Sequence, residues 1–189
     1  MARADSLGAW VARVFLWLIP SFALWHFASG PLASLQATLA TVGTNAWFPG
    51  LLSGWERAGG TIDFATRLHA SAAGRIGDLV FGVNARAYSY GLALYLALCL
   101  ATDPRRWKGL LAGAAALLPV VAWGVLFDLL QQVFISHGAL AARDYLPTGW
   151  ERNLIALGYQ AGAILLPMAA PVVAWGVVHR GFLARRMAT

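Results

Sequence analysis

The chain has 189 residues, of which 59% are apolar and 12% are charged, and it carries a net charge of +6. A soluble domain usually has about 25% charged residues. A single soluble core of this size could not bury so much apolar surface, so lipid is the expected solvent. The basic residues stand in short clusters beside apolar runs, without the basic and aromatic stripe of a nucleic-acid binder, which excludes nucleic acid as a partner.

Four apolar runs predict membrane spans, because a helix needs roughly 17–25 apolar residues to cross a bilayer. They cover about residues 10–29, 88–102, 109–130 and 154–178. The second run is short and has to borrow flanking residues. Backbone groups in lipid must be hydrogen-bonded within their own segment, so all four are predicted to be helices. The expected fold is mainly α: a polytopic membrane protein with four transmembrane helices, forming one integral-membrane domain over residues 1–189.

The Lys and Arg residues predict the orientation. One set precedes or opens the first span, joins the second to the third and follows the fourth: Arg3, Arg13, Arg105, Arg106, Lys108, Arg180, Arg185 and Arg186. These positions share one side if the spans alternate, so the positive-inside rule predicts that both termini are cytoplasmic. A cleaved signal peptide is the alternative for the first run. Pro20 splits that run and Trp25-His26 is bulky near the supposed cleavage site, which favours an uncleaved anchor.

The outer segment, about residues 30–87, is predicted to hold two small structures. "PLASLQATLATVG" places Leu32, Leu35, Leu39 and Val42 on one helical face, which predicts an interfacial helix. "WFPGLLSGWERAGG" then predicts a break. Apolar residues alternate with others in "TIDFATRL" and again in "DLVFGV", so the sequence predicts a small β-hairpin. A lone hairpin is marginal in water, so it has to pack on the helices or on a partner.

The stretch "WGVLFDLLQQVF" holds the most polar positions inside an apolar run. An ionisable residue in a membrane helix is a functional hypothesis by default. Asp128 lies twenty residues after Lys108, which is roughly 30 Å of helix and the full hydrocarbon thickness, so it is expected near the outer rim. Polar residues from all four spans reach that level, and together they form the predicted polar cluster: His26, Tyr88, Asp128, Gln131, Gln132, Tyr159 and Gln160.

This predicted cluster has three interpretations: a ligand pocket, a proton-handling site, or interhelical hydrogen bonding, which is the default. Cys99 lies near the cytoplasmic end of the second span, with no charge within a helical turn to lower its pKa, so it is predicted to be a packed apolar residue. The histidines are too scattered for a metal site. No catalytic residue, metal or cofactor is therefore predicted.

Three segments carry a family resemblance: "GDLVFGVNARAYSYGLALYLALCLAT", "LLPVVAWGVLFDLLQQ" and "IALGYQAGAILLPMAAPVVAW". They resemble the exosortase H-associated membrane proteins, small bacterial inner-membrane proteins found beside exosortase H, to which the processing of C-terminal sorting signals on exported proteins is ascribed. The resemblance brings no catalytic residue to this chain. Exosortases resemble Cys-Arg-His enzymes acting at the outer face, whereas Cys99 is predicted at the inner side. The resemblance therefore implies an accessory of the sortase.

Two functional hypotheses follow. The first is a non-enzymatic accessory in the bacterial inner membrane, which contacts lipid and binds an exosortase or its sorted substrate at the outer face through the hairpin edges. The alternative is a small intramembrane enzyme, or a ligand- or proton-handling protein, that uses the polar cluster at the outer rim. It requires the members of that cluster to lie within hydrogen-bond reach of one another.

Overall fold

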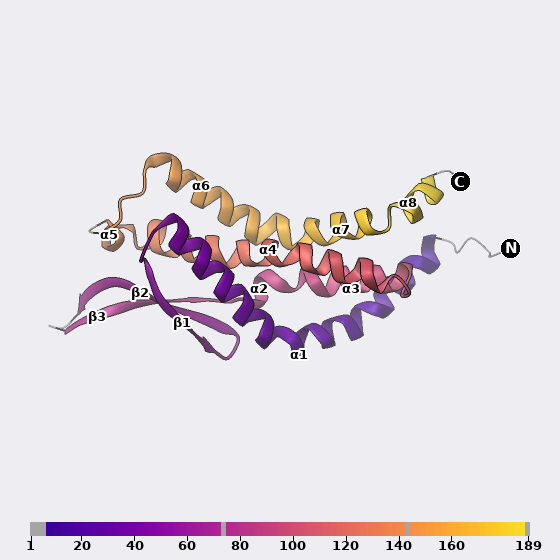
Figure 1. Ribbon diagram of the computed structural model, residues 1–189, viewed down its shortest axis with the longest axis horizontal. Helices are drawn as coiled ribbons and strands as arrows, with labels where there is room; N and C mark the ends of the chain where they lie inside the picture. Colours follow the sequence, from indigo (N-terminus) through magenta and orange to yellow (C-terminus); the bar gives the residue numbers. More distant parts are fainter. Residues whose placement is uncertain (1–6, 73–74, 143, 188–189) are drawn as a thin grey trace.

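The computed structural model describes residues 7–72, 75–142 and 144–187, and it is mainly helical with one small sheet. The helical elements are α1 (Leu7–Trp47), α2 (Arg86–Ser89), α3 (Gly91–Thr102), α4 (Trp107–Gln131), η1 (Gln132–Ser136), α5 (Gly138–Ala141), α6 (Gly149–Gln160), η2 (Ala161–Leu165), α7 (Leu166–Val178) and α8 (Arg180–Met187). The strands are β1 (Leu52–Ala58), β2 (Thr61–Ala72) and β3 (Arg75–Val83). Figure 1 shows an elongated bundle whose chain ends and α3–α4 loop lie at one end, with the sheet toward the other.

Three helical stretches are long and apolar enough to cross a membrane, within the described residues: Leu7–Trp47, Trp107–Ser136 and Gly149–Val178. They include the first, third and fourth predicted spans and support a membrane location. The second predicted span forms α2 and α3 and does not meet that length. The twelve residues of α3 rise about 18 Å, against about 30 Å of hydrocarbon. α3 packs against α1 and α7, inside the bundle.

The prediction of a separate interfacial helix after the first span is wrong, because α1 runs unbroken for 41 residues through Pro20 and Pro31. The hydroxyl of Ser29 donates to the carbonyl of His26 (2.7 Å) and that of Ser34 to the carbonyl of Gly30 (3.4 Å). Both bonds lie near Pro31, whose missing N–H leaves the carbonyl of Phe27 without its usual helix donor. Figure 1 shows that the helix bends midway along its length.

The second half of α1 turns a face of small residues toward the rest of the protein. Ala33, Ala37 and Ala40 are buried, whereas Leu35 and Leu39 are exposed. Small side chains allow two backbones to approach closely, which is the main source of packing when lipid removes the hydrophobic drive between helices. The leucine face therefore turns outward, and the alanine face packs on the sheet and α4.

The predicted hairpin is present as β2 and β3, and it is extended by a third strand that the sequence did not predict. The sheet is antiparallel in the order β1-β2-β3. Ala58 pairs with Thr61 across a two-residue turn, and the first turn residue, Gly59, has φ +62°, a conformation that glycine adopts without strain. The predicted break after the helical segment is present, because α1 ends at Trp47, and the rest of the segment holds β1 and this turn.

The sheet has one buried and one exposed face, as its alternating pattern requires. Ile62, Phe64, Thr66 and Leu68 of β2 point inward and are buried. They pack with the alanine face of α1 and with Val125, Leu129 and Leu130 from the end of α4 in one core cluster. A second cluster, around Tyr95, Cys99, Leu117 and Trp175, fills the opposite end of the bundle. Cys99 is buried there as a packed side chain, as predicted.

A glycine contact between α3 and α7 generates a stability prediction. A Cβ on Gly91 would overlap the main-chain carbonyl oxygen of Pro167, which cannot move without shifting α7. We expect Gly91→Ala to lower the free energy of unfolding by about 1–3 kcal/mol, a typical overpacking cost. Gly8→Ala in α1 is the matched control, because a Cβ there meets open space. It should be neutral or slightly stabilising, since alanine favours helix. Thermal unfolding in mild detergent measures both, and equal stability of the two variants would contradict the close α3–α7 contact.

Candidate functional site

A polar network lies where the sheet meets α2 and the end of α4. The Tyr88 hydroxyl donates to Oδ2 of Asp128 (2.9 Å), and Nε2 of Gln132 lies within reach of Oδ1 of the same carboxylate (3.1 Å). Nε2 of Gln132 also donates to the carbonyl of Gly82 in β3 (3.2 Å). Asp128 is half-buried and Tyr88 is buried. The network ties three elements together around one carboxylate.

Local sequence explains how these groups meet. Asp128 and Gln132 are four residues apart, so they share one helical face. Gly124 lies one turn before Asp128, and a Cβ there would overlap the ring of Tyr88. The missing side chain lets that ring lie flat against α4 and brings its hydroxyl to the carboxylate.

The structure does not bring the whole predicted cluster together. Gln131 donates to the hydroxyl of Ser136 (3.3 Å), away from Asp128. His26 is exposed on α1, with its ring against Phe27, and Gln160 is exposed on α6. Tyr159 is half-buried on α6. The shared network therefore consists of Tyr88, Asp128 and Gln132, with Gly82 as an additional main-chain partner.

Sequence reasoning missed Gln36, the most deeply buried amide near this level. Its Nε2 donates to the carbonyls of Ala85 (3.3 Å) and Val121 (3.2 Å), and the residue is 1% exposed. It therefore joins α1 to α4 and to the turn before α2. The signal was present, because Gln36 stands among the small residues of the face that packs inward. The sequence analysis used only the leucines of this segment and gave Gln36 no role.

The space around the network limits its chemistry. The cavity that Tyr88 lines, between α3, α4 and α7, has a volume of about 10 Å³. That is about the smallest space that can hold one water molecule. Within the described residues, no group of three or more His, Cys, Asp or Glu side chains could hold a metal ion. The geometry fits interhelical hydrogen bonding.

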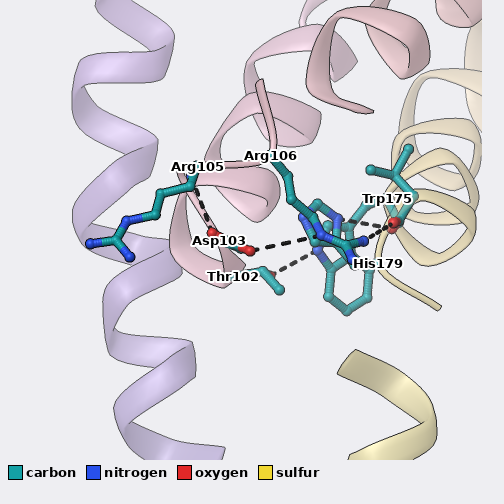
Figure 2. A network of polar contacts seen from close by, with 7 residues as sticks. Thr102, Asp103, Arg105, Arg106, Trp175 and His179 are labelled. Carbon is teal, nitrogen blue, oxygen red and sulfur yellow. Dashed lines mark hydrogen bonds and ion pairs between the residues drawn. The ribbon is translucent and has the colours of Figure 1, made fainter. Parts of the chain in front are cut away.

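A second polar network lies at the other end of the bundle, where the chain ends are (Figures 1 and 2). The indole N–H groups of Trp10 and Trp175 both donate to Oγ1 of Thr102, at 3.2 and 2.9 Å. Arg106 donates from Nη1 to the carbonyl of Val178 (3.1 Å), which joins the α3–α4 loop to the end of α7. Its Nε lies 3.8 Å from Oδ2 of Asp103.

This second network was not predicted. The sequence drew attention to its arginines only as markers of orientation, and His179 was treated as one of several scattered histidines. His179 is 2% exposed, and its Nδ1 lies 3.3 Å from the carbonyl oxygen of Trp175. A contact between the α3–α4 loop and the end of α7 joins residues far apart in the chain, so spacing along the sequence carries no signal for it.

The Tyr88–Asp128 contact yields a measurable coupling. Asp128→Ala leaves two donors without their acceptor, so we expect it to cost about 1–3 kcal/mol of unfolding free energy. Tyr88→Phe should cost about 1 kcal/mol. Because both changes break the same bond, the double variant should lose less than the sum, with a coupling of about 0.5–3 kcal/mol. Gln131→Ala is the control, because Gln131 lies three residues after Asp128 but does not bond its carboxylate. This variant should change stability by less than about 0.5 kcal/mol. Additive losses in denaturant unfolding would contradict the bond.

Comparison with known proteins gives one family match. The model of the exosortase H-associated membrane protein family matches residues 4–182. No curated protein and no solved structure matches the chain. The matched residues include the sheet, both polar networks and all four apolar runs, so the resemblance inferred from the sequence is confirmed. The chain belongs to the family of exosortase H-associated membrane proteins.

Proposed function

We propose that the protein is a non-enzymatic accessory of an exosortase-type protein-sorting system, and that it binds the sortase or its exported substrate at the outer face of a bacterial inner membrane. Family membership supports an association with an exosortase system. The observation that carries the proposal is the small sheet on one end of the bundle, because a sheet edge can add a strand from another chain.

The proposed topology has both termini in the cytoplasm and one integral-membrane domain with four spans, in which α2 and α3 complete the crossing together. The distribution of charge supports this orientation. Arg105, Arg106, Lys108 and Arg180 are exposed at the end that holds the chain termini. Positive residues favour the cytoplasmic side. The sheet, toward the opposite end, is then at the outer face.

The two edges of the sheet differ. On β3, the carbonyl of Gly82 already accepts a hydrogen bond from Gln132, so this edge is partly covered by α4 and η1. β1 pairs only with β2 within the described strands. The Asn45 side chain of α1 bonds both main-chain groups of Leu52 at the start of β1, whereas Glu56, Arg57 and Ala58 at its end are exposed. Charged side chains on an edge strand discourage unspecific pairing and leave the backbone available to a matched partner. β1 is therefore the proposed docking edge.

The catalytic alternative receives less support from the geometry. It requires His26, Asp128, Gln131 and Gln160 to lie around one cavity, but His26 and Gln160 are exposed and Gln131 bonds Ser136. Asp128→Asn tests it directly, because asparagine keeps the shape and an acceptor but cannot exchange a proton. We expect normal processing of the sorted substrate in a strain carrying this variant. Loss of processing with unchanged protein level would support the proton-handling alternative.

A photo-crosslinking amino acid at Glu56 tests the docking edge. In native membranes we expect a covalent adduct with the sortase or its substrate, identified by mass spectrometry after purification of the tagged chain. The control carries the same amino acid at Val80, which is exposed on β3 at the other side of the sheet, and should give little adduct. An adduct at Val80 alone would refute docking on β1. A clean monomer from mild detergent, with normal substrate processing in a deletion strain, would refute the accessory function itself.

A further inference from the structure

Two neighbouring cavities lie at the end of the bundle opposite the sheet, around the residues drawn in Figure 2. One has a volume of about 270 Å³ and is lined by Thr102, Asp103, Arg106, His179, Gly181 and Phe182. The other has about 310 Å³ and is lined by Arg105, Arg106, Trp107, Lys108, Gly109 and Val178. Arg106 borders both. Since one water occupies about 30 Å³, each cavity has room for a group of several heavy atoms.

The second cavity has the character of an anion site. Arg105, Arg106 and Lys108 line it together with the first residues of α4, a 25-residue helix. The side chain of Arg106, the N-cap residue of α4, makes no capping bond, and the first N–H groups of a helix have no acceptor within the helix itself. A guanidinium group has five donors. Arg106 uses one of them on Val178 and keeps others for a ligand.

The first cavity offers acceptors instead. The Nδ1 atom of His179 faces the carbonyl oxygen of Trp175, which can only accept, so the proton of the ring lies on Nδ1. Burial lowers the pKa of His179, which keeps the ring neutral and leaves Nε2 with a bare lone pair. Nε2 is buried and has no hydrogen-bond partner among the described residues. Asp103 adds a carboxylate to the same wall.

Cationic groups lie on one side of Arg106 and hydrogen-bond acceptors on the other. A ligand that fits both sides therefore needs an anionic group and a hydrogen-bond donor. We propose that this end of the bundle binds a phosphodiester headgroup that carries a hydrogen-bond donor, an ammonium or a hydroxyl. The phosphate lies at Arg105, Arg106 and Lys108, and the donor end reaches Nε2 of His179 and the carboxylate of Asp103. A simple anion would leave His179 unpaired and would be repelled by Asp103. The cavity that these two residues line therefore requires a ligand with a hydrogen-bond donor.

Both a phospholipid and a soluble glycerophosphodiester carry this chemistry. The position at a bundle end favours the lipid, because Trp107, which lines the cationic cavity, is 59% exposed beside Lys108, the combination found where helices meet headgroups. This site does not depend on the proposed docking of a sortase or substrate at β1, and the two are tested separately.

The experiment measures thermal unfolding of the full-length protein in mild detergent during titration with short-chain lipids. Dihexanoyl phosphatidylethanolamine has an ammonium that donates, and dihexanoyl phosphatidylcholine has the same phosphate without a donor. We expect half-maximal stabilisation at a concentration at least about tenfold lower for the ethanolamine lipid. Glycerophosphoethanolamine is titrated in parallel. If glycerophosphoethanolamine stabilises the protein as strongly as the ethanolamine lipid does, the soluble headgroup is sufficient. If it stabilises the protein less, the acyl chains are part of the ligand. Both results support the site.

Variants separate the two halves of the site. Arg106→Gln should abolish stabilisation by both lipids, whereas His179→Phe should bring the ethanolamine lipid to the level of the choline lipid. If His179→Phe does not fold, Asp103→Ala serves the same purpose, because it removes the second acceptor from a half-exposed position. Arg180→Gln is the matched control, since it removes an exposed arginine at the same end that lines neither cavity, and it should bind as the wild type does.

Three outcomes would overturn the proposal. Equal stabilisation of the wild type by the ethanolamine and choline lipids would show that no donor is recognised. Unchanged binding in Arg106→Gln would remove the phosphate contact. Stabilisation by inorganic phosphate alone, at the same concentration as the ethanolamine lipid, would show an anion site without the second half.

Discussion

Close approach of backbones along α4 is the constraint on which the rest of the structure depends. Lipid gives little hydrophobic drive between helices, so contact relies on small residues that let neighbours come near. Gly113 of α4 receives the ring of Tyr95, Gly124 receives the ring of Tyr88, and Phe127 packs on Gly158 of α6. These contacts hold α2, α3 and α6 around one helix, and they also bring the hydroxyl of Tyr88 to Asp128. The polar network is thus a consequence of the packing.

The sequence predicted which segments are helical more accurately than it predicted where they break or which side they bury. Apolar runs identify the core of α1, α4 and α7, because composition alone decides whether a segment can lie in lipid. The sequence prediction ended the first span before Pro31, yet α1 continues through this proline, and prolines are tolerated inside membrane helices. The sequence identified the leucine face of this segment, but not that the alanine face packs on the sheet and α4. β1 was missed because only its first residue, Leu52, is buried, so its alternation is weak.

The sequence predicted the level of the candidate site along the helices, but not the directions in which its side chains point. Counting residues along α4 placed Asp128 near the level of Tyr88, and the spacing of four placed Gln132 beside it. In the structure both side chains hydrogen-bond to the carboxylate of Asp128. Depth does not fix which way a helix is rotated about its axis, so His26 and Gln160 were included although they point outward. The contact of Arg106 with Val178 could not be predicted for a different reason, because it joins two residues that are far apart in the chain.

Helix length links the two ends of the molecule. The stretch Trp107–Ser136 has 30 residues, which rise about 45 Å, whereas the hydrocarbon core is about 30 Å thick. In the proposed topology, which puts Lys108 at the cytoplasmic boundary, about 15 Å of this helix would project beyond the outer boundary, and α1 is longer still. The sheet shares a core cluster with Leu129, Leu130 and Val133 of this projecting part. In the proposed function, the length of the rigid helices therefore sets how far the edge of β1 stands above the membrane. A headgroup bound at Arg106 would fix the depth of the opposite end of the bundle in the membrane, and so fix that distance.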